Sequence, residues 1–227
     1  MNSLRFAGIL ALPALLALGC SKPKLDPATA IQVLVSSTPE KATLTFGGKP
    51  FGETPHTLTV ARVEDLLTLK ATREKEEAVE KRIRFLSMNQ AEVTFVFGAD
   101  RSTMARTLGF PRILVFDYGA GVTFEINRAE LKPEFRPLLD RQATLLNTNF
   151  AGISVYICGH TDSQGNRDHN LVLSVDRAKA VAEDLATRGV PKDHLKIQGF
   201  ASDYPLADNG TDQGRALNRR TEVILPQ

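Results

Sequence analysis

The stretch Ile157-Cys158-Gly159-His160-Thr161-Asp162 joins an apolar strand to a polar loop. The apolar run 153–158 predicts a buried strand. A long amphipathic segment that carries Arg177 follows the loop. A carboxylate at a strand end and a guanidinium on the next helix can contact one small charged ligand from two sides. The residues alone also allow a structural role, in which Asp162 caps or bridges and Arg177 pairs on the surface.

Regular spacing of apolar residues predicts alternating strands and helices around this stretch. One helix begins near Asn166 and ends near Arg188, with Gly189 as its C-cap. An earlier helix contains Pro137 past its first turn, so it begins late or bends there. The other predicted elements are strands at 112–118 and 122–126, which form a hairpin, strands at 153–158, 194–200 and 220–225, and a short helix at 211–218. This order predicts an α/β sandwich with helices packed on a mixed sheet.

Residues 31–97 have a different pattern, in which apolar residues recur at every second position. Such alternation between turn signals predicts half-buried strands. The strands are expected at 31–35, 42–46, 67–72, 82–85 and 93–97, with a turn at Gly47-Gly48 and a charged hairpin tip at 73–77. The block is therefore predicted to be a small, all-β, antiparallel sandwich.

Residues 98–109 break the alternation with glycine, charged and hydroxyl residues, and we place a domain boundary there. The predicted division is a signal peptide at 1–19, a lipidated cysteine and tether at 20–30, the β block at 31–97, a linker at 98–109 and a second domain at 110–227.

Composition and motifs argue against several classes of function. The 28 basic and 26 acidic residues give a net charge of +2, which does not favour nucleic acid. Cys20 and Cys158 lie in different settings, so no disulfide framework is expected. A metal or hydrolase site can be drawn from His160, Asp162, Asp168 and His169. The chain has no HExxH, GxSxG or CxxC motif, so we expect no enzyme activity, metal or cofactor.

The N-terminus has the layout of a secretory signal that ends at a cysteine. Arg5 supplies positive charge, and residues 6–18 are nearly all apolar but too short to span a bilayer. Gly19-Cys20 resembles a bacterial lipoprotein cleavage site, although Leu16 stands one position earlier than usual. Lipid on Cys20 would anchor the chain, because each buried methylene contributes about 0.8 kcal/mol. An ordinary signal peptide or a short anchor is the alternative.

Three motifs in the second domain resemble the OmpA-like C-terminal domain of OmpA, Pal and MotB proteins. They are F-E-I-N at 124–127 with A-E-L-K-P at 129–133, then G-H-T-D at 159–162 with Asn170, Leu173-Ser174 and Arg177-Ala178, and finally G-R-A at 214–216 with N-R-R at 218–220. The resemblance covers residues 113–225 and keeps the motifs in the family's order. It implies a domain that binds the meso-diaminopimelate (DAP) of peptidoglycan stem peptides.

DAP ends in an ammonium and a carboxylate on one carbon, so its receptor needs an anion and a two-bond cation. The resemblance implies that Asp162 binds the ammonium and that Arg177 binds the carboxylate. The further pocket residues are Asn170, on the same helix stripe as Arg177, and, by the resemblance, Thr161, Leu173, Phe124 and Glu125. The arginines Arg215, Arg219 and Arg220 are interpreted as solvated or structural ion pairs.

Residues 31–97 resemble a PEGA domain, mainly through the Gly52-Glu53-Thr54-Pro55 step. PEGA domains are non-catalytic surface modules. With Ser21 after the cysteine, the resemblances imply an outer-membrane lipoprotein that faces the periplasm and links the membrane to the wall, with envelope proteins as further partners. The alternative is a surface adhesion or protein-docking module that the OmpA-like domain only anchors. A MotB-like stator is disfavoured, since it needs a spanning helix with a proton-carrying Asp.

Overall fold

The computed structural model describes residues 30–119, 123–124 and 128–227. The predicted signal, Cys20 and Glu125 lie outside the described residues. The strands are β1 (Ile31–Thr38), β2 (Thr43–Phe46), β3 (Lys49–Glu53), β4 (His56–Val60), β5 (Lys70–Arg73), β6 (Glu76–Glu77), β7 (Glu80–Ser87), β8 (Gln90–Val96), β9 (Ile113–Gly119), β10 (Val155–His160), β11 (Leu195–Gly199) and β12 (Arg220–Pro226). The helices are α1 (Val63–Thr68), α2 (Thr103–Leu108), α4 (Arg136–Asn149), α5 (Arg167–Thr187) and α6 (Asp212–Asn218), with 3₁₀ turns η1 (Pro133–Phe135) and η2 (Lys192–His194).

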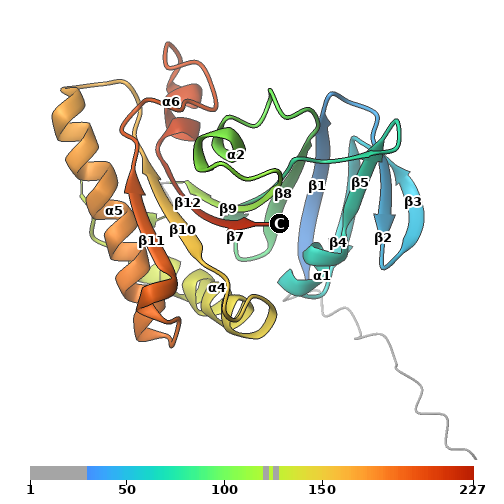
Figure 1. Ribbon diagram of the computed structural model, residues 1–227, viewed down its shortest axis with the longest axis horizontal. Coiled ribbons are helices and arrows are strands. Elements are labelled where there is room, and N and C mark those ends of the chain that lie inside the picture. The colour runs from blue at the N-terminus through green and yellow to red at the C-terminus, as the bar shows by residue number, and fades with distance from the viewer. Residues whose placement is uncertain (1–29, 120–122, 125–127) are drawn as a thin grey trace, which may run out of the picture.

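Two sheets form the frame of the molecule (Figure 1). One has eight strands in the order β11-β10-β12-β9-β7-β8-β1-β4, and the other has four in the order β3-β2-β5-β6. Helices α4 and α5 contact each other, and α5 contacts β10 and β11. The opposite face of the sheet carries α2, whose Met104 clusters with Cys158 and Ile224. The predicted fold class, helices packed on a mixed sheet beside an all-β sheet, is confirmed.

One buried apolar cluster runs through both halves of the chain. It contains Val33 of β1 and Leu44 of β2 together with Leu139 of α4 and Leu185 of α5. Because burial of apolar surface is the main favourable term in folding, a shared cluster ties the stability of the two halves together.

Most of the elements predicted after residue 130 are confirmed. Helix α5 spans Arg167–Thr187, and Gly189 follows it with a φ of +88°, as expected for a C-cap. Helix α4 begins at Arg136, after the 3₁₀ turn. Pro137 therefore lies in the first helical turn, where its missing N–H has no helical partner to lose.

The predicted hairpin of strands 112–118 and 122–126 is wrong. Strand β9 pairs with β7 on one side and with β12 on the other, so neither edge is free for the following segment. Phe124 instead forms an isolated bridge with Leu131, and Val122 and Ile126 lie outside the described residues. Strands that are distant in sequence pair with β9, and the segment that directly follows β9 does not.

The predicted strand at 67–72 begins too early, because α1 occupies its first residues and β5 begins at Lys70. The backbone N–H of Arg62 donates to the Asp65 carboxylate at 3.0 Å, and this contact fixes the start of α1. The turns at Gly47-Gly48 and Glu74-Lys75 are confirmed, since all four residues have positive φ.

Parallel pairing corrects the prediction of an antiparallel N-terminal sandwich. The four-stranded sheet is antiparallel, but β1 runs parallel to β8. Strand β7 is also parallel to β9, with Glu80 opposite Ile113. The division into two domains at 98–109 stays a prediction, but strands from both sides of this segment pair within one sheet.

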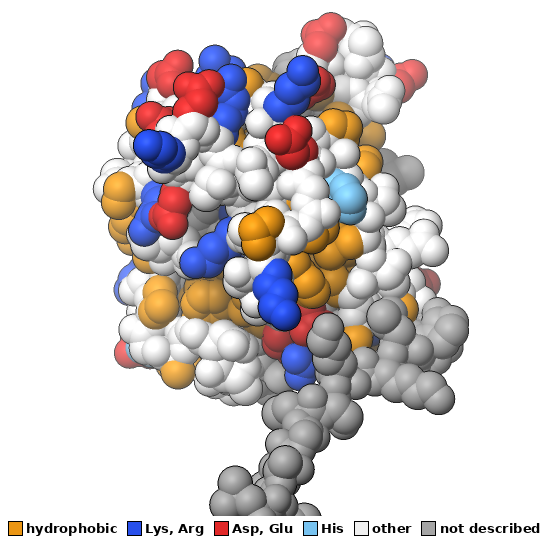
Figure 2. All heavy atoms as spheres, turned by 90° about the vertical axis from the view of Figure 1, so that its right-hand side faces the viewer, with side chains coloured by type: hydrophobic (Ala, Val, Ile, Leu, Met, Phe, Trp, Pro, Cys, Tyr) orange, Lys and Arg blue, Asp and Glu red, His pale blue; other side chains and the backbone are white. Residues whose placement is uncertain are grey.

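The face of the molecule on the side of β2 and β3 carries basic, acidic and hydrophobic side chains (Figure 2). Within the described residues, none of the helices is both long and apolar enough to cross a membrane.

Candidate binding site

Asp162 lies two residues after the end of β10 and is 7% exposed. Its Oδ1 accepts a hydrogen bond from the backbone N–H of Gln164 at 3.0 Å. Its Oδ2 accepts from Nη1 of Arg219 at 2.6 Å, and the Arg219 side chain is 40% exposed. The interpretation of Arg219 as an ion-pair residue is confirmed, and its partner is the carboxylate predicted to recognise the ligand.

Hydrogen bonds fix the backbone on either side of Asp162. The N–H of Thr161 donates to the carbonyl of Ala201 at 2.8 Å, and its hydroxyl donates to the carbonyl of Asp162. The amide of Asn170 donates to the carbonyls of Asp162 and Gln164, at 3.3 and 2.8 Å. Thr161 and Asn170 are buried and hold the loop that presents the carboxylate.

Two glycines let α5 lie directly against the sheet beside this loop. Gly159 and Gly199 are register partners on β10 and β11. A Cβ on Gly159 would lie 1.9 Å from the carbonyl oxygen of Ser174, which is too close for any side chain. The Ser174 hydroxyl accepts from the N–H of Ala201 at 3.1 Å, so the helix is also bonded to the neighbouring loop. This close approach brings Arg177, one turn further on, to the strand ends.

Arg177 is 3% exposed and is held at two points. Its Nε donates to the carbonyl of Arg128 at 3.0 Å, and its guanidinium carbon lies 5.1 Å from the centre of the Phe124 ring. Burial lowers the pKa of Arg177, Arg219 lowers it further, and Asp162 opposes the shift. Arg177, Arg219 and Asp162 are therefore within electrostatic reach of one another.

The structure thus brings together most of the residues predicted for the site. Phe124 is buried against Arg177, and Leu173 is partly buried one turn before it on α5. Glu125 and Cys20 lie outside the described residues, so their predicted roles stay predictions.

Asn218 has a positioning role that the sequence did not reveal. It is fully buried, and its Oδ1 accepts from the N–H groups of Leu206 and Ala207. Its Nδ2 donates to Oδ1 of Asn209 at 2.9 Å, and the same oxygen accepts from the N–H of Ser163. The loop after β10 is therefore bonded through Asn209 to the end of α6. The only signal in the sequence was the place of Asn218 in the N-R-R motif.

Comparison with known proteins identifies the family to which the region around the site belongs. Residues 123–219 match the model described as "OmpA family". This region is an OmpA family domain. Similar curated proteins include the probable lipoprotein YiaD of Escherichia coli, 37% identical over 112 residues, and the peptidoglycan-binding protein ArfA of Mycobacterium tuberculosis, 39% identical over 107 residues. The peptidoglycan-associated lipoprotein of Pseudomonas putida is 37% identical over 100 residues.

The family match lies in the second half of the chain. The three alignments cover 49%, 47% and 44% of this chain and 51%, 32% and 59% of the relatives, so the chain spans less than two thirds of each relative. Among solved structures, the cell wall anchor of the T6SS from Pseudomonas aeruginosa is 32% identical, with a TM-score of 0.45, and the match covers 49% of this chain and 79% of that one.

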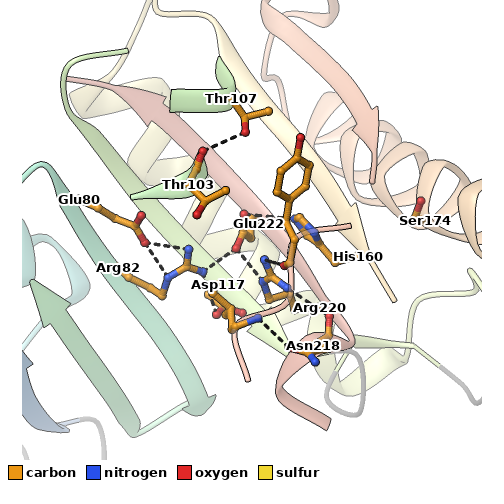
Figure 3. A network of polar contacts seen from close by, with 12 residues as sticks. Glu80, Arg82, Thr103, Thr107, Asp117, His160, Ser174, Asn218, Arg220 and Glu222 are labelled. Atoms are coloured by element: carbon orange, nitrogen blue, oxygen red, sulfur yellow. Dashed lines mark hydrogen bonds and ion pairs between the residues drawn. The ribbon is translucent and has the colours of Figure 1, made fainter. Parts of the chain in front are cut away.

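A buried charged network links β7, in the N-terminal half, to β9 and β12 (Figure 3). Nη1 of Arg82, on β7, donates to Glu222 at 2.6 Å and to Asp117 at 3.1 Å, and both carboxylates are fully buried. Nε of Arg220 donates to Glu222 at 2.7 Å. Burial alone would raise the pKa of Glu222, but Arg220 and Arg82 outweigh it and hold that pKa well below its ordinary value. Glu222 is therefore a carboxylate at neutral pH.

His160 belongs to this network. Its Nε2 lies 3.3 Å from the Glu222 carboxylate, and its ring stacks on Phe200. Asp168 and His169 are exposed at the start of α5. Across the described parts of the chain, no group of three or more His, Cys, Asp or Glu residues is placed to hold a metal.

The burial of His160 predicts a loss of stability in mild acid. Burial lowers its pKa below 6.5, Arg220 lowers it further, and Glu222 opposes the shift. The unfolded chain therefore binds more protons as the pH falls below about 6.5, and the free energy of unfolding decreases by up to about 1.4 kcal/mol per pH unit. Urea titrations at pH 7.5 and 5.5 measure this slope. His160→Gln should flatten it, and an equal slope in that variant would contradict the assignment.

Proposed function

We propose that this chain is a non-catalytic protein that binds peptidoglycan through the DAP of its stem peptides. The observation that carries the proposal is the pair of buried, oppositely charged groups at the end of β10. Asp162 and Arg177 approach from a loop and a helix that the fold holds together. The OmpA family domain around them supports the proposal, as do relatives that are named peptidoglycan-binding and peptidoglycan-associated proteins.

The ion pair between Asp162 and Arg219 defines how an ammonium would enter. The ammonium of DAP takes a position at the Asp162 carboxylate, either beside Arg219 or in its place. Arg219 is partly exposed, so water can solvate its guanidinium when the pair opens. One cation then replaces another, and Asp162 never remains buried without a partner, which would be costly.

Arg177 supplies the matching cation in a fixed orientation. Its Nε is already bonded to the Arg128 carbonyl and its face lies on Phe124, so few rotamers are lost when the terminal nitrogens bind a carboxylate. The guanidinium of arginine offers two parallel hydrogen bonds to a carboxylate, which the ammonium of lysine does not. A ligand that carries a carboxylate beside its ammonium can bind Arg177 as well as Asp162. The site is therefore expected to prefer an amino acid end over a simple amine.

We further propose that lipid on Cys20 anchors the chain in the outer membrane, facing the periplasm. The relatives named lipoproteins support this placement, and residues 31–97 then separate the anchor from the wall-binding site. Labelling of the chain with a radioactive fatty acid, lost in Cys20→Ser, tests the anchor.

Walls that differ only in the diamino acid test the ligand. The protein should sediment with wall containing DAP, and free DAP should compete. Wall with lysine at the same position lacks the terminal carboxylate, so retention should fall roughly tenfold or more when Arg177 loses its bidentate partner. Equal retention on both walls would exclude DAP as the ligand. Release of soluble wall fragments during a long incubation would contradict the non-catalytic assignment.

A further inference from the structure

Arg82 connects the N-terminal half to carboxylates on the strands beside the site. It projects from β7 and donates to Asp117 on β9 and to Glu222 on β12. A third carboxylate, Glu80, accepts from its Nε at 2.9 Å and holds the guanidinium in place. Oδ1 of Asp117 has no hydrogen-bond partner within the described residues, so Asp117 depends on the contacts of its other oxygen.

Glu222 in turn contacts both strand ends that carry the site (Figure 3). His160 and Arg220 are register partners at the end of β10 and the start of β12. One Glu222 oxygen accepts from Arg220, and the other lies 3.3 Å from His160. Asp162 comes two residues after His160, and Arg219 comes immediately before Arg220. A single carboxylate therefore lies against both strand ends from which Asp162 and Arg219 pair.

We propose that Arg82, which lies outside the OmpA family domain, is a positioning residue of the wall-binding site. It fixes the Glu222 carboxylate, and through His160 and Arg220 it fixes the geometry of the Asp162–Arg219 ion pair. The N-terminal half then takes part in binding without touching the ligand. This inference rests on the proposed function only for its effect on wall affinity, because its effect on the ion pair is independent of any ligand.

A purely structural role for Arg82 makes a different prediction. In that case its removal lowers the stability of the whole fold but leaves the ion pair unchanged in the molecules that remain folded. The readouts must therefore report on folded protein only. The side-chain Nε–H resonance of Arg219 and the backbone resonance of Asp162 do so in the absence of ligand.

The test compares Arg82→Gln and Arg82→Lys with Arg73→Gln in the full chain. Arg73 lies on β5 and pairs with Glu74 at the surface, so it is a matched arginine without contact to the network. Arg82→Gln should shift the Arg219 and Asp162 resonances and lower affinity for DAP-containing wall fragments roughly fivefold or more. Arg82→Lys should recover part of both effects, since lysine restores the charge but not the planar fork. Arg73→Gln should match the wild type.

Wild-type resonances and affinity in folded Arg82→Gln would overturn the proposal. If Arg82→Gln does not fold, Arg82→Lys decides by the same two readouts, and wild-type values there would overturn it equally. If the wild-type chain does not bind the fragments, the proposed function fails. The resonances of Arg219 and Asp162 still decide whether Arg82 positions their ion pair.

Discussion

Asp162→Asn should lower affinity for DAP-containing wall roughly thirtyfold or more, because loss of one partner of a buried charge pair costs about 2–5 kcal/mol. The substitution keeps the shape of the side chain and an acceptor for the N–H of Gln164. It removes the negative charge that is expected to bind the ammonium, and it replaces the oxygen that faces Arg219 with an NH₂ group. Arg219 loses its partner but is partly exposed, so the melting temperature should fall little. Sedimentation with isolated wall across a range of concentrations measures the change.

Asp203→Asn is the matched control for this change. Asp203 lies in the neighbouring loop and pairs with Arg167 at the surface, so wall affinity should not change. Arg177→Lys should weaken binding less than Arg177→Ala, because the charge remains while the two-bond fork is lost. Undiminished sedimentation of the Asp162→Asn, Arg177→Lys double variant would rule out this pair as the recognition site.

Gly159→Ala should destabilise the protein by about 3 kcal/mol or more, or prevent folding. The added methyl would lie 1.9 Å from the Ser174 carbonyl oxygen and 2.7 Å from the carbonyl carbon. Both atoms belong to the backbone of α5, so no side-chain rotation can relieve the contact. The helix must move away from β10, and Arg177 must move with it. Urea unfolding gives the loss of stability.

Gly119→Ala is the control for the glycine prediction. Gly119 ends β9 and pairs with Arg220, and a Cβ built there meets no atom within 4 Å among the described residues beyond its chain neighbours. Its free energy of unfolding should stay within about 0.5 kcal/mol of the wild type. Comparable destabilisation by both substitutions would show that the close approach of α5 does not control stability at Gly159.

The C-terminal elements could be predicted from the sequence because their signals are local. The apolar stripe and the glycine C-cap mark α5, and Thr211 caps α6 through a bond from the N–H of Gly214. The same local logic failed for β9, whose partners β7 and β12 are distant in sequence. Parallel strands are not joined by a short turn, so no local sequence signal marks their pairing.

The charged residues of the candidate site could be predicted from the sequence, but the residues that hold them in place could not. Asp162 and Arg177 stand out by motif and spacing, and the structure puts them within electrostatic reach. The pairing of Asp162 with Arg219 was not foreseen, because a charge run such as Arg219-Arg220 is usually solvated. Arg82 alternates with apolar residues on β7, so its polarity indicates an outward face. Only the eight-stranded sheet reveals that this face is buried beside β9.

The parallel pairing of β1 with β8 also determines how the protein carries a mechanical load. The register runs from Gln32 opposite Gln90 to Thr38 opposite Val96. If the proposed anchor pulls on residue 30 along the axis of β1, the hydrogen bonds of β1 with β8 and β4 are loaded in shear together. Bonds loaded in shear break as a set, whereas peeled bonds break one after another. In the proposed anchor, the chain therefore enters the fold at a strand that is paired on both sides and resists such a pull.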